Sequence, residues 1–259
     1  MQIKFYFVVV KLYFFMISKQ KIKFISSLRH NKYRLKFNCF IAEGEHVVNS
    51  FMCSDFQIES VFATKTWIDS NKSCNASLVT QKEIGRISCL KNPSNVLAII
   101  SKPNQKYKNK EFNAIYPIVL LDGVSDPGNM GSIIRTADWF GINSIYLSEQ
   151  CVDVFNPKVV QATMGSLARV NIYRVNAKHF LSELKQQDVT CYGACLSGTD
   201  LSKVNKVSKA AIVFGSESHG ISSEIKKLLD EKILISGKNQ QVDSLNVAVA
   251  FGIILSDFG

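Results

Sequence analysis

Apolar residues recur at two spacings along the second half of the chain, and the two spacings alternate. Short, nearly continuous apolar runs predict buried strands at residues 116–124, 144–148, 171–175, 190–196, 210–216 and 232–236. Apolar residues spaced three and four positions apart predict helices at 129–141, 157–170, 178–187, 222–230 and 244–255. Strands that alternate with helices are typical of an α/β fold whose parallel sheet is covered on both faces. Such a sheet binds ligands at the carboxyl ends of its strands, so the turns that follow strands are the candidate sites.

The first part of the chain carries a smaller set of elements. A helix is predicted around 44–53 and strands at 58–64 and 96–101, which indicates a second, smaller α/β module. Residues 101–113, SKPNQKYKNKEFN, are polar, rich in lysine and contain a proline, as expected of a linker. The predicted organisation is an extension at 1–18, a first domain at 19–100, a linker at 101–115 and a second domain at 116–259.

The positive charge of the chain lies almost entirely in its first part. Residues 1–112 hold 18 Lys and Arg against 7 Asp and Glu, whereas residues 113–259 hold 13 against 14. The apolar share of 46% and the charged share of 20% are those of an ordinary folded protein. A basic module joined to a neutral one favours a polyanion partner such as RNA or DNA, although a lysine-rich surface that is merely solvated gives the same count.

The chain begins with an apolar and aromatic stretch, MQIKFYFVVVKLYFFMIS, which Lys4 and Lys11 interrupt. The stretch is too short and too broken to span a membrane. No small-residue cleavage site of the A-x-A kind lies nearby, which argues against a signal peptide. We expect that translation starts at Met16, or that the preceding residues are a disordered or strand-like addition.

The seven cysteines indicate reduced thiols. Their number is odd, no CxxC pair occurs, and no histidine lies near Cys191 and Cys195. This pattern fits neither a zinc site nor a disulfide framework. We therefore expect a cytoplasmic protein without a bound metal.

The turn after the first strand of the second domain carries the first candidate site. The sequence SDPGN leads into Asn129, a residue type favoured at helix N-caps, and Gly128 and Gly131 leave the main chain open to close approach. Arg135 lies off the apolar stripe of the helix that follows. It either pairs with Asp138 at the surface or faces a cleft above the sheet, where its guanidinium would fork onto a phosphate.

A second candidate turn, VFGSESHGIS, follows the strand at 210–216. Gly215 and Gly220 flank Glu217, which suits a ligand that touches the main chain, while His219 is expected to be a surface residue. The turn lacks the GxxxxGK pattern of a phosphate loop, and Glu217 would repel phosphate. The dinucleotide fingerprint GxGxxG is also absent from the chain, which argues against a nucleotide-dependent oxidoreductase.

The third candidate stretch is QVDSLNVAVAFGIILS, residues 241–256. Its helix is apolar nearly all round, which predicts that it is buried. Asn246 lies in the first turn of that helix. A buried amide needs hydrogen-bond partners, so Asn246 is expected to cap the helix or to join a polar network in the core.

Together the three stretches resemble a known motif set. DPGNMGSIIRTADWFG, GSESHG and DSLNVAVAFGI, in this order near the C-terminus, resemble the SpoU (TrmH-like) family of RNA ribose 2′-O-methyltransferases. NPKVVQATMGSLARV resembles the segment between the first and second motifs of that family. The resemblance covers about residues 116–259, and the motif set is highly specific. SLRHNKYRLKFNCFIAEGEHVVNS is similar to the RNA substrate-binding domain of many members, which has a ribosomal-protein-type fold.

The resemblance implies properties that composition and spacing do not reveal. Family members belong to the SPOUT superfamily, in which a parallel α/β domain threads its C-terminal segment through a loop to form a trefoil knot. They hold S-adenosylmethionine mostly by main-chain groups, need no metal or membrane, and act as homodimers whose sites are completed across the interface. The implied substrate is structured RNA, with ribosomal RNA favoured over transfer RNA because of the separate first domain.

The resemblance also implies roles for individual residues. Arg135 would contact the RNA phosphate and the 2′-OH and help to deprotonate it. Asn129 and Asn246 would orient the loop and the substrate. Glu217 would hold Arg135 or the motif architecture in place, or contact substrate. The implied cofactor contacts are Gly215, Ile235, Ser236, Ser244, Leu245 and Asn246.

One departure from the family pattern concerns the cofactor loop. Members show Ile-Pro before the third motif, whereas this chain has ILISGKNQQVDSLN, in which either Ile235-Ser236 or Ser236-Gly237 replaces that pair. Loss of the proline removes a fixed φ angle from the loop. The contact there is expected to be through the main chain, so activity is still expected. The alternatives are a transfer RNA 2′-O-methyltransferase and a catalytically dead RNA-binding relative.

Overall fold

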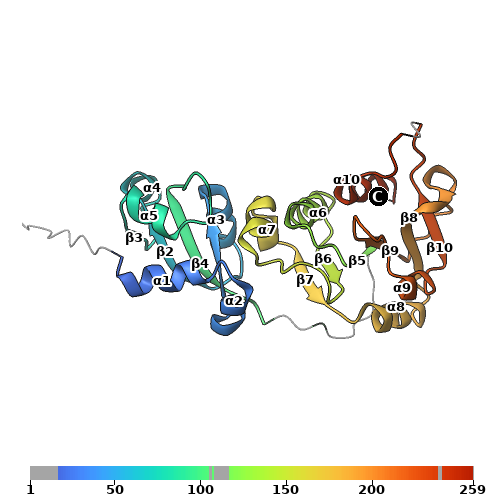
Figure 1. The fold of residues 1–259 in the computed structure, drawn as a ribbon, viewed down its shortest axis with the longest axis horizontal. Coiled ribbons are helices and arrows are strands. Elements are labelled where there is room, and N and C mark those ends of the chain that lie inside the picture. The colour runs from blue at the N-terminus through green and yellow to red at the C-terminus, as the bar shows by residue number, and fades with distance from the viewer. Residues whose placement is uncertain (1–16, 105–106, 108–116, 239–240, 259) are drawn as a thin grey trace, which may run out of the picture.

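The structure is a computed structural model that describes residues 17–104, 107, 117–238 and 241–258. The predicted start at Met16, the stretch before it and most of the predicted linker lie outside the described residues. The described residues form two sheets with their helices (Figure 1). The strands of the first sheet come from residues 39–101 and those of the second from residues 118–234.

The first sheet has four strands and is mixed. Its order is β1-β4-β2-β3, and β4 pairs antiparallel with β1 and β2 while β3 adds parallel to β2. Alternate residues of β1 face opposite sides: Phe40 packs in one buried cluster with Phe51, and Ile41 packs in another with Ile84. The elements are α1 (Lys19–Ser27), α2 (Asn31–Phe37), β1 (Cys39–Glu43), α3 (Glu45–Met52), β2 (Ile58–Ala63), α4 (Lys65–Ser70), β3 (Ser77–Leu78), α5 (Gln81–Ile87) and β4 (Val96–Ser101).

The second sheet has six strands, and every pairing in it is parallel. Its order is β10-β8-β9-β5-β6-β7. The expected α/β fold with a parallel sheet is therefore confirmed. The strands are β5 (Ile118–Asp122), β6 (Ser144–Leu147), β7 (Asn171–Arg174), β8 (Thr190–Asp200), β9 (Ala210–Gly215) and β10 (Glu231–Leu234).

Helices cover both faces of the second sheet because alternate side chains of its strands are apolar on each face. Val119 of β5 packs in one cluster with Ile133 of α6, and Leu120 packs in another with Phe180 of α8. The first face carries α6 (Pro127–Trp139), α7 (Pro157–Ala162), the short turn η1 (Ser166–Ala168) and α10 (Val247–Phe258). The second face carries α8 (Ala177–Lys185) and α9 (Ser223–Lys226), and η2 (Leu201–Lys203) follows β8.

A single cluster of buried apolar side chains joins the two sheets. It runs from Phe40 and Val48 in the first part of the chain to Val160 and Ile133 in the second. Helix α7 lies between the first sheet and α6 (Figure 1). The two parts of the chain therefore share a packed interface.

The helix predicted at 157–170 is broken, so that prediction is wrong. Helix α7 ends at Ala162, Met164 and Gly165 have positive φ angles of 50° and 91°, and η1 follows. A Cβ at position 165 would lie 2.7 Å from the Cβ of Ser50 on α3. The close approach of α3 and the left-handed conformation explain why glycine occupies this position and why the helix stops.

The final helix is also placed differently from the prediction. Helix α10 buries Phe251, Ile254 and Leu255, but Val249 is 51% exposed and Ile253 is 40% exposed. Its apolar character all round therefore does not make it fully buried, because only one side packs on the sheet. The helix predicted at 222–230 is shorter than expected, because only α9, Ser223–Lys226, is helical there.

No helix in the described part of the chain is long and apolar enough to cross a membrane. All seven cysteines have free thiols. Burial raises the pKa of Cys89 and of Cys191 to about 11, so both are protonated and unreactive at neutral pH.

Candidate active site

Helix α6 begins earlier than the sequence suggests. Its N-cap is Asp126, whose side chain accepts a hydrogen bond of 2.8 Å from the N–H of Asn129. Pro127 is the first residue of the helix. Proline suits that position because an N–H there would have no partner within the helix. The predicted N-cap at Asn129 is therefore wrong. The side chain of Asn129, released from capping, is available for other contacts.

The amide of Asn129 links all three sequence motifs. Its Nδ2 donates to Oε1 of Glu217, and its Oδ1 accepts a hydrogen bond of 2.8 Å from Nδ2 of Asn246. Glu217 and Asn246 are exposed, and Asn129 is half-buried. This hydrogen-bonded group, which we call the Asn129 triad, brings together three of the four predicted catalytic side chains.

The sheet explains why these motifs meet. Strands β5 and β9 are parallel neighbours, with Asp122 opposite Gly215, so the chain leaves both strands at the same edge. The turn after β5 leads to Asn129, and the turn after β9 leads to Glu217. Helix α10, which follows Asn246, packs against α6. The arrangement matches the expectation that ligands meet a parallel sheet at the carboxyl ends of its strands.

The loop after β9 is closed tightly by main-chain contacts. Ser216 and Gly220 exchange two backbone hydrogen bonds of 3.1 and 2.9 Å. A side chain at Gly215 would collide with the main chain of Gly220 and Ile221, so glycine is required by space at this position. His219 is exposed, as expected, with its Nδ1 2.8 Å from the hydroxyl of Ser218.

Asp122 is a site residue that the sequence analysis missed. It ends β5, is 7% exposed, and its Oδ2 accepts a hydrogen bond of 2.8 Å from the N–H of Ser222. The bond ties the far end of the loop after β9 to the end of β5. The sequence did contain a signal for Asp122, because it is a carboxylate at the end of an otherwise apolar strand.

Arg135 lies apart from the Asn129 triad, on the part of α6 that faces a pocket. The pocket has a volume of about 760 Å³. The side chain of Arg135 is exposed and makes no hydrogen bond or ion pair with any other described residue. The pocket is lined from both parts of the chain by His46, Ser132, Arg135, Thr136, Asp138, Trp139, Ala162, Met164, Ser166 and Arg169.

Asp138 pairs with Arg169, so the suggested pairing with Arg135 is wrong. The guanidinium of Arg169 contacts Asp138 at 2.6 and 3.0 Å, because η1 brings Arg169 against the side of α6. Partial burial would raise the pKa of Asp138, but hydrogen bonds from Arg169 and Ser166 hold it below the usual value. Asp138 is therefore a carboxylate at neutral pH, and its partner is Arg169 rather than Arg135.

The predicted cofactor residues lie at the end of β9, directly after β10 and directly before α10. Ile235 directly follows β10 and packs against the buried cluster, whereas Ser236, Ser244 and Leu245 are exposed. The main-chain groups of Ser244 and Leu245 make no hydrogen bond with another described residue. Exposed, unpaired main-chain donors and acceptors suit a ligand that is held by backbone contacts.

Ser236, which belongs to both of the pairs that could stand in place of Ile-Pro, has a partner of its own. Its hydroxyl donates to the carboxylate of Asp200, at the end of β8. Hydrogen bonds from Ser202 and then Ser236 lower the pKa of Asp200 to about 2. The serine thus ties the segment after β10 to the end of β8 by a hydrogen bond.

Asn246 is exposed, so the expectation of a buried amide is wrong. Its side-chain oxygen accepts hydrogen bonds from the N–H groups of Ala248 at 2.9 Å and Val249 at 3.3 Å. The amide therefore caps α10 with its oxygen while its nitrogen bonds to Asn129. Capping was one of the two roles expected for it.

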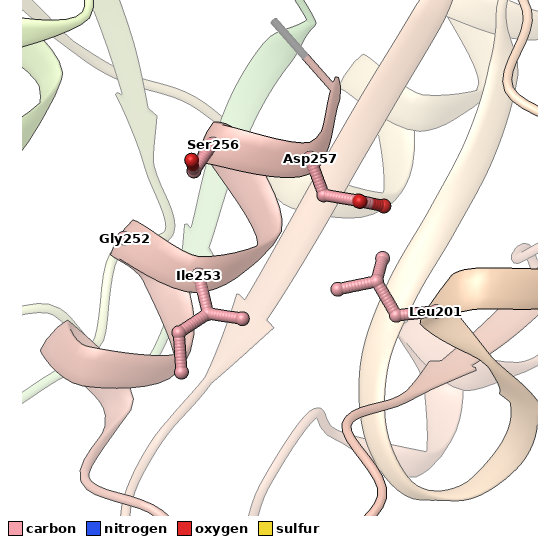
Figure 2. A pocket seen from close by; sticks show the side chains of 5 residues that line it. All are labelled: Leu201, Gly252, Ile253, Ser256 and Asp257. Carbon is pink, nitrogen blue, oxygen red and sulfur yellow. The ribbon is translucent and has the colours of Figure 1, made fainter.

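A second pocket, of about 390 Å³, lies at the outer side of α10 (Figure 2). Its lining contains no residue of the Asn129 triad and, apart from Asp257, no ionisable side chain; Asp257 pairs with Lys206 at 2.6 Å. Ile253 and Leu201 point into it (Figure 2). Its composition suits an apolar contact better than chemistry.

No group of three or more potential metal ligands occurs among the residues that the structure describes.

Comparison with known families divides the chain into two matches. Residues 116–256 match the SpoU rRNA Methylase family. Residues 19–98 match the MRM3-like substrate binding domain. The first match contains the Asn129 triad and Arg135, and the second contains α1 and α2.

Comparison with individual proteins gives matches over nearly the whole chain. The 23S rRNA (guanosine(2553)-2′-O)-methyltransferase RlmP of Bacillus subtilis is 28% identical over 240 residues, which cover 91% of this chain and 94% of RlmP. A putative RNA methyltransferase of the TrmH family from Porphyromonas gingivalis has a similar structure, with a TM-score of 0.82, 35% identity, and coverage of 94% of this chain and 98% of that chain. An AdoMet-bound rRNA methyltransferase from Sinorhizobium meliloti matches with a TM-score of 0.81, 28% identity, and coverage of 94% and 96%.

Proposed function

Because the chain belongs to the SpoU rRNA Methylase family, we propose that it transfers a methyl group from S-adenosylmethionine to a ribose 2′-hydroxyl of structured RNA, with ribosomal RNA as the substrate. The observation that carries this proposal is the Asn129 triad, together with an unpaired Arg135 on the same helix, α6. The three motif segments of the family meet there through side-chain hydrogen bonds. An RNA-binding relative that had lost activity would have no need to keep both the triad and an unpaired arginine.

The loops around the triad fit S-adenosylmethionine. Ser244 and Leu245 offer main-chain groups that no described residue uses, and Ile235 adds an apolar wall at the end of β10. Gly215 keeps the loop after β9 compact. We propose these residues, with Ser236 and Asn246, as the cofactor contacts. The bound cofactor supplies an electrophilic methyl group on a sulfonium.

Arg135 is the residue that we propose to act on the RNA. A neutral hydroxyl is a poor nucleophile, so the enzyme must align it and stabilise the charge that develops on its oxygen. The guanidinium of Arg135 is exposed in its pocket and has no protein partner among the described residues. Its N–H groups can donate hydrogen bonds to a phosphate and to the adjoining 2′-oxygen at the same time. An arginine keeps its proton in proteins, so its role is alignment and electrostatic stabilisation as the hydroxyl loses its proton to solvent water, which reaches the exposed guanidinium.

We propose that the Asn129 triad orients the substrate and the loops. Asn129 is held from both sides, by Glu217 and by Asn246, so its side chain has one preferred orientation. Glu217 belongs to this group through its bond to Asn129, and we assign it to positioning of the loop after β9. No hydrogen bond or ion pair joins Glu217 to Arg135 among the described residues.

The RNA-binding surface that we propose lies on α1 and α2. Residues 17–38 contain seven Lys and Arg and no Asp or Glu. The rings of Tyr33 and Phe37 are stacked with centroids 6.2 Å apart, and Lys36 lies over the ring of Phe37. Cations attract the phosphates, and exposed rings offer stacking surfaces for unpaired bases. This surface supports residues 19–100 as the substrate-binding domain, joined by a linker at 101–115 to a methyltransferase domain at 116–259.

We propose that two copies of the chain associate through α10. Val249, Gly252, Ile253 and Ser256 lie on its outer side at helical spacing, and both apolar members are exposed. Exposed apolar side chains gathered on one helix face are typical of a contact surface. The family resemblance adds the C-terminal trefoil knot to this proposal, and the seven free thiols favour the cytoplasm as the compartment.

The substitution Arg135→Ala tests the proposed function. We expect methyl transfer from radiolabelled S-adenosylmethionine to total RNA to fall by about 10²-fold or more, while calorimetry shows the same cofactor affinity as the parent. Lys178→Ala, which removes an exposed cation from α8, is the matched control and should keep full activity. Undiminished turnover by Arg135→Ala would contradict the assignment. Mapping of ribose methylation in a strain that lacks the protein would identify the nucleotide and separate ribosomal from transfer RNA.

A further inference from the structure

Arg34 is a buried charge that the proposed chemistry does not use. Its side chain is 2% exposed, although it lies on α2 in the most basic part of the chain. Its Nη1 donates to the carbonyls of Leu28 and Arg29 at 2.9 and 2.8 Å. The remaining donors, Nε and Nη2, both lie 2.8 Å from the carboxylate of Asp153. Each guanidinium nitrogen of Arg34 therefore has a partner, with two carbonyls in its own domain and one carboxylate across the interface.

Asp153 belongs to the loop that leads into α7, on the methyltransferase side. Its other carboxylate oxygen accepts a hydrogen bond of 3.1 Å from the N–H of Phe155. Phe155 then reaches the first sheet, where its ring lies 4.7 Å from that of Phe40 between centroids. The ion pair and the ring contact thus join the same loop to the substrate-binding domain.

A second contact between the domains occurs at Gly165, beyond the end of α7. The main chain of Gly165 approaches α3 so closely that a Cβ would lie 2.7 Å from the Cβ of Ser50. Met164 and Ser166, on either side of it, line the Arg135 pocket, and so does His46 of α3. The interface therefore extends to the pocket in which the ribose would be aligned.

Helix α7 connects these contacts to Arg135. Gly131 of α6 lies against Ala162 of α7, where a Cβ at Gly131 would be only 3.0 Å from the carbonyl carbon of Ala162. The contacts on one side of α7 hold the first domain, and the contact on its other side holds the helix that carries Arg135 (Figure 1). Closely packed protein interiors have low compressibility and transmit strain. A displacement of the first domain is therefore passed through α7 to α6.

We propose that Arg34 is a positioning residue for methyl transfer: its ion pair with Asp153, together with the approach of Gly165 to Ser50, holds the substrate-binding domain in one place relative to Arg135. RNA bound on α1 and α2 is then delivered to the pocket at a set distance. This inference rests on the proposed function. An ordinary two-domain chain would instead carry a mobile binding domain on its linker.

Asp153→Asn tests the ion pair, with Asp230→Asn as a matched control. Asn at either position retains an acceptor for the neighbouring N–H, of Phe155 or of Cys191. Asp230 pairs with Lys185 at 2.7 Å within the methyltransferase domain, and both side chains are well exposed. We expect Asp153→Asn to lower the single-turnover methylation rate at saturating RNA by about tenfold. RNA and cofactor dissociation constants should stay within roughly threefold of the parent, because both binding surfaces are untouched.

A solution measurement separates positioning from a loss of folding. Small-angle X-ray scattering of the RNA-free protein should show a larger radius of gyration for Asp153→Asn than for the parent or Asp230→Asn, while circular dichroism is unchanged. Parent-like rate and scattering for Asp153→Asn would overturn the proposal, and so would a fall in RNA affinity as large as the fall in rate. If the parent itself fails to methylate RNA, the proposed function is wrong, and the scattering comparison still decides whether the ion pair holds the domains.

Gly165→Ala provides an independent test, with a second glycine of positive φ, Gly44, as the control position. Gly44 has a φ of +90° and Gly165 of +91°, but a Cβ at Gly44 would meet nothing within 4 Å. Both alanine variants place a side chain at a positive φ, with ψ angles of 144° at Gly44 and −9° at Gly165, and only Gly165→Ala pushes against α3. We expect Gly165→Ala to lower the single-turnover rate more than Gly44→Ala, and Ser50→Gly to restore part of the loss when combined with it. Equal rates for the two alanine variants, or no recovery with Ser50→Gly, would contradict the proposal.

Discussion

The α1–α2 surface and the Asn129 triad differ in how their polar groups are held. On α1 and α2 the cations Lys23, Lys32 and Lys36 are exposed and contact at most an aromatic ring. In the triad, each polar side chain is fixed by a hydrogen bond to one from another motif. A surface that grips the repetitive phosphates of RNA tolerates mobile lysines, whereas alignment of one hydroxyl needs oriented groups.

The net charge also differs between the two regions. The excess of Lys and Arg lies in residues 1–112, while the part with the triad is nearly neutral. Affinity for RNA and the rate of methyl transfer should therefore respond to different substitutions. Arg34 is the exception, because this basic residue of α2 is buried and acts on position rather than on affinity.

The largest effect after Arg135→Ala is expected for Asn129→Ala. The substitution leaves Glu217 and Asn246 without their shared partner, so we expect the single-turnover rate to fall by about 10²-fold with RNA affinity unchanged. Asn176→Ala is the control, because Asn176 also bonds at a helix start, on α8 away from the site. Radiolabel transfer measures the single-turnover rate, and filter binding measures the RNA affinity. A parallel loss of both would show that the triad holds RNA rather than orienting it.

A smaller effect is expected from substitutions on the α1–α2 surface, and it should change RNA affinity instead of the methylation rate. Replacing Lys23, Lys32 and Lys36 together with Gln should weaken RNA binding by about tenfold at physiological salt and flatten its salt dependence by roughly two to three units of slope. The single-turnover rate at saturating RNA should be unchanged. Replacing Lys178, Lys209 and Lys227, exposed cations of the methyltransferase part, with Gln is the control of equal charge. Unaltered RNA binding by the first variant would place the RNA elsewhere.

The smallest effect on rate is expected from the outer side of α10. Ile253→Glu puts a charge into the proposed contact between copies, so sedimentation velocity should show monomers where the parent forms dimers. We expect the rate per chain to fall by about fivefold at low protein concentration and to recover partly at high concentration. Lys178→Gln, at an exposed cation of α8 on the other face of the sheet, is the control. A parent protein that sediments as a monomer would exclude the contact.

Much of the second sheet could be predicted because its pattern is local. The apolar runs of β5, β6 and β9 and the spacing of α6 and α8 follow from burial on both faces of a parallel sheet. The break after α7 could not be predicted, because it depends on α3, more than a hundred residues earlier in the chain. The exposed side of α10 escaped prediction for a similar reason: an apolar side chain does not reveal whether a neighbour covers it.

The candidate site shows the same division between local and long-range information. Its motifs were recognisable from residue types in order along the chain, and the turns after strands marked where they would lie. The pairing of Asp138 with Arg169, the cap at Asp126 and the ties made by Asp122 were not foreseen. The roles assigned to Arg135, the triad and the cofactor loops stay predictions until the variants are measured.

By itself, the amino-acid sequence determined the strand and helix order of the parallel sheet, the basic character of the first part and the motif residues of the site, because each depends on residue types at short spacing. Only the tertiary structure decided which of those residues touch. The bonds of Asn129 to Glu217 and Asn246 span 88 and 117 positions, and the ion pair of Arg34 with Asp153 spans 119. Contacts over such separations depend on how the sheets pack, and periodicity along the chain carries no record of that packing.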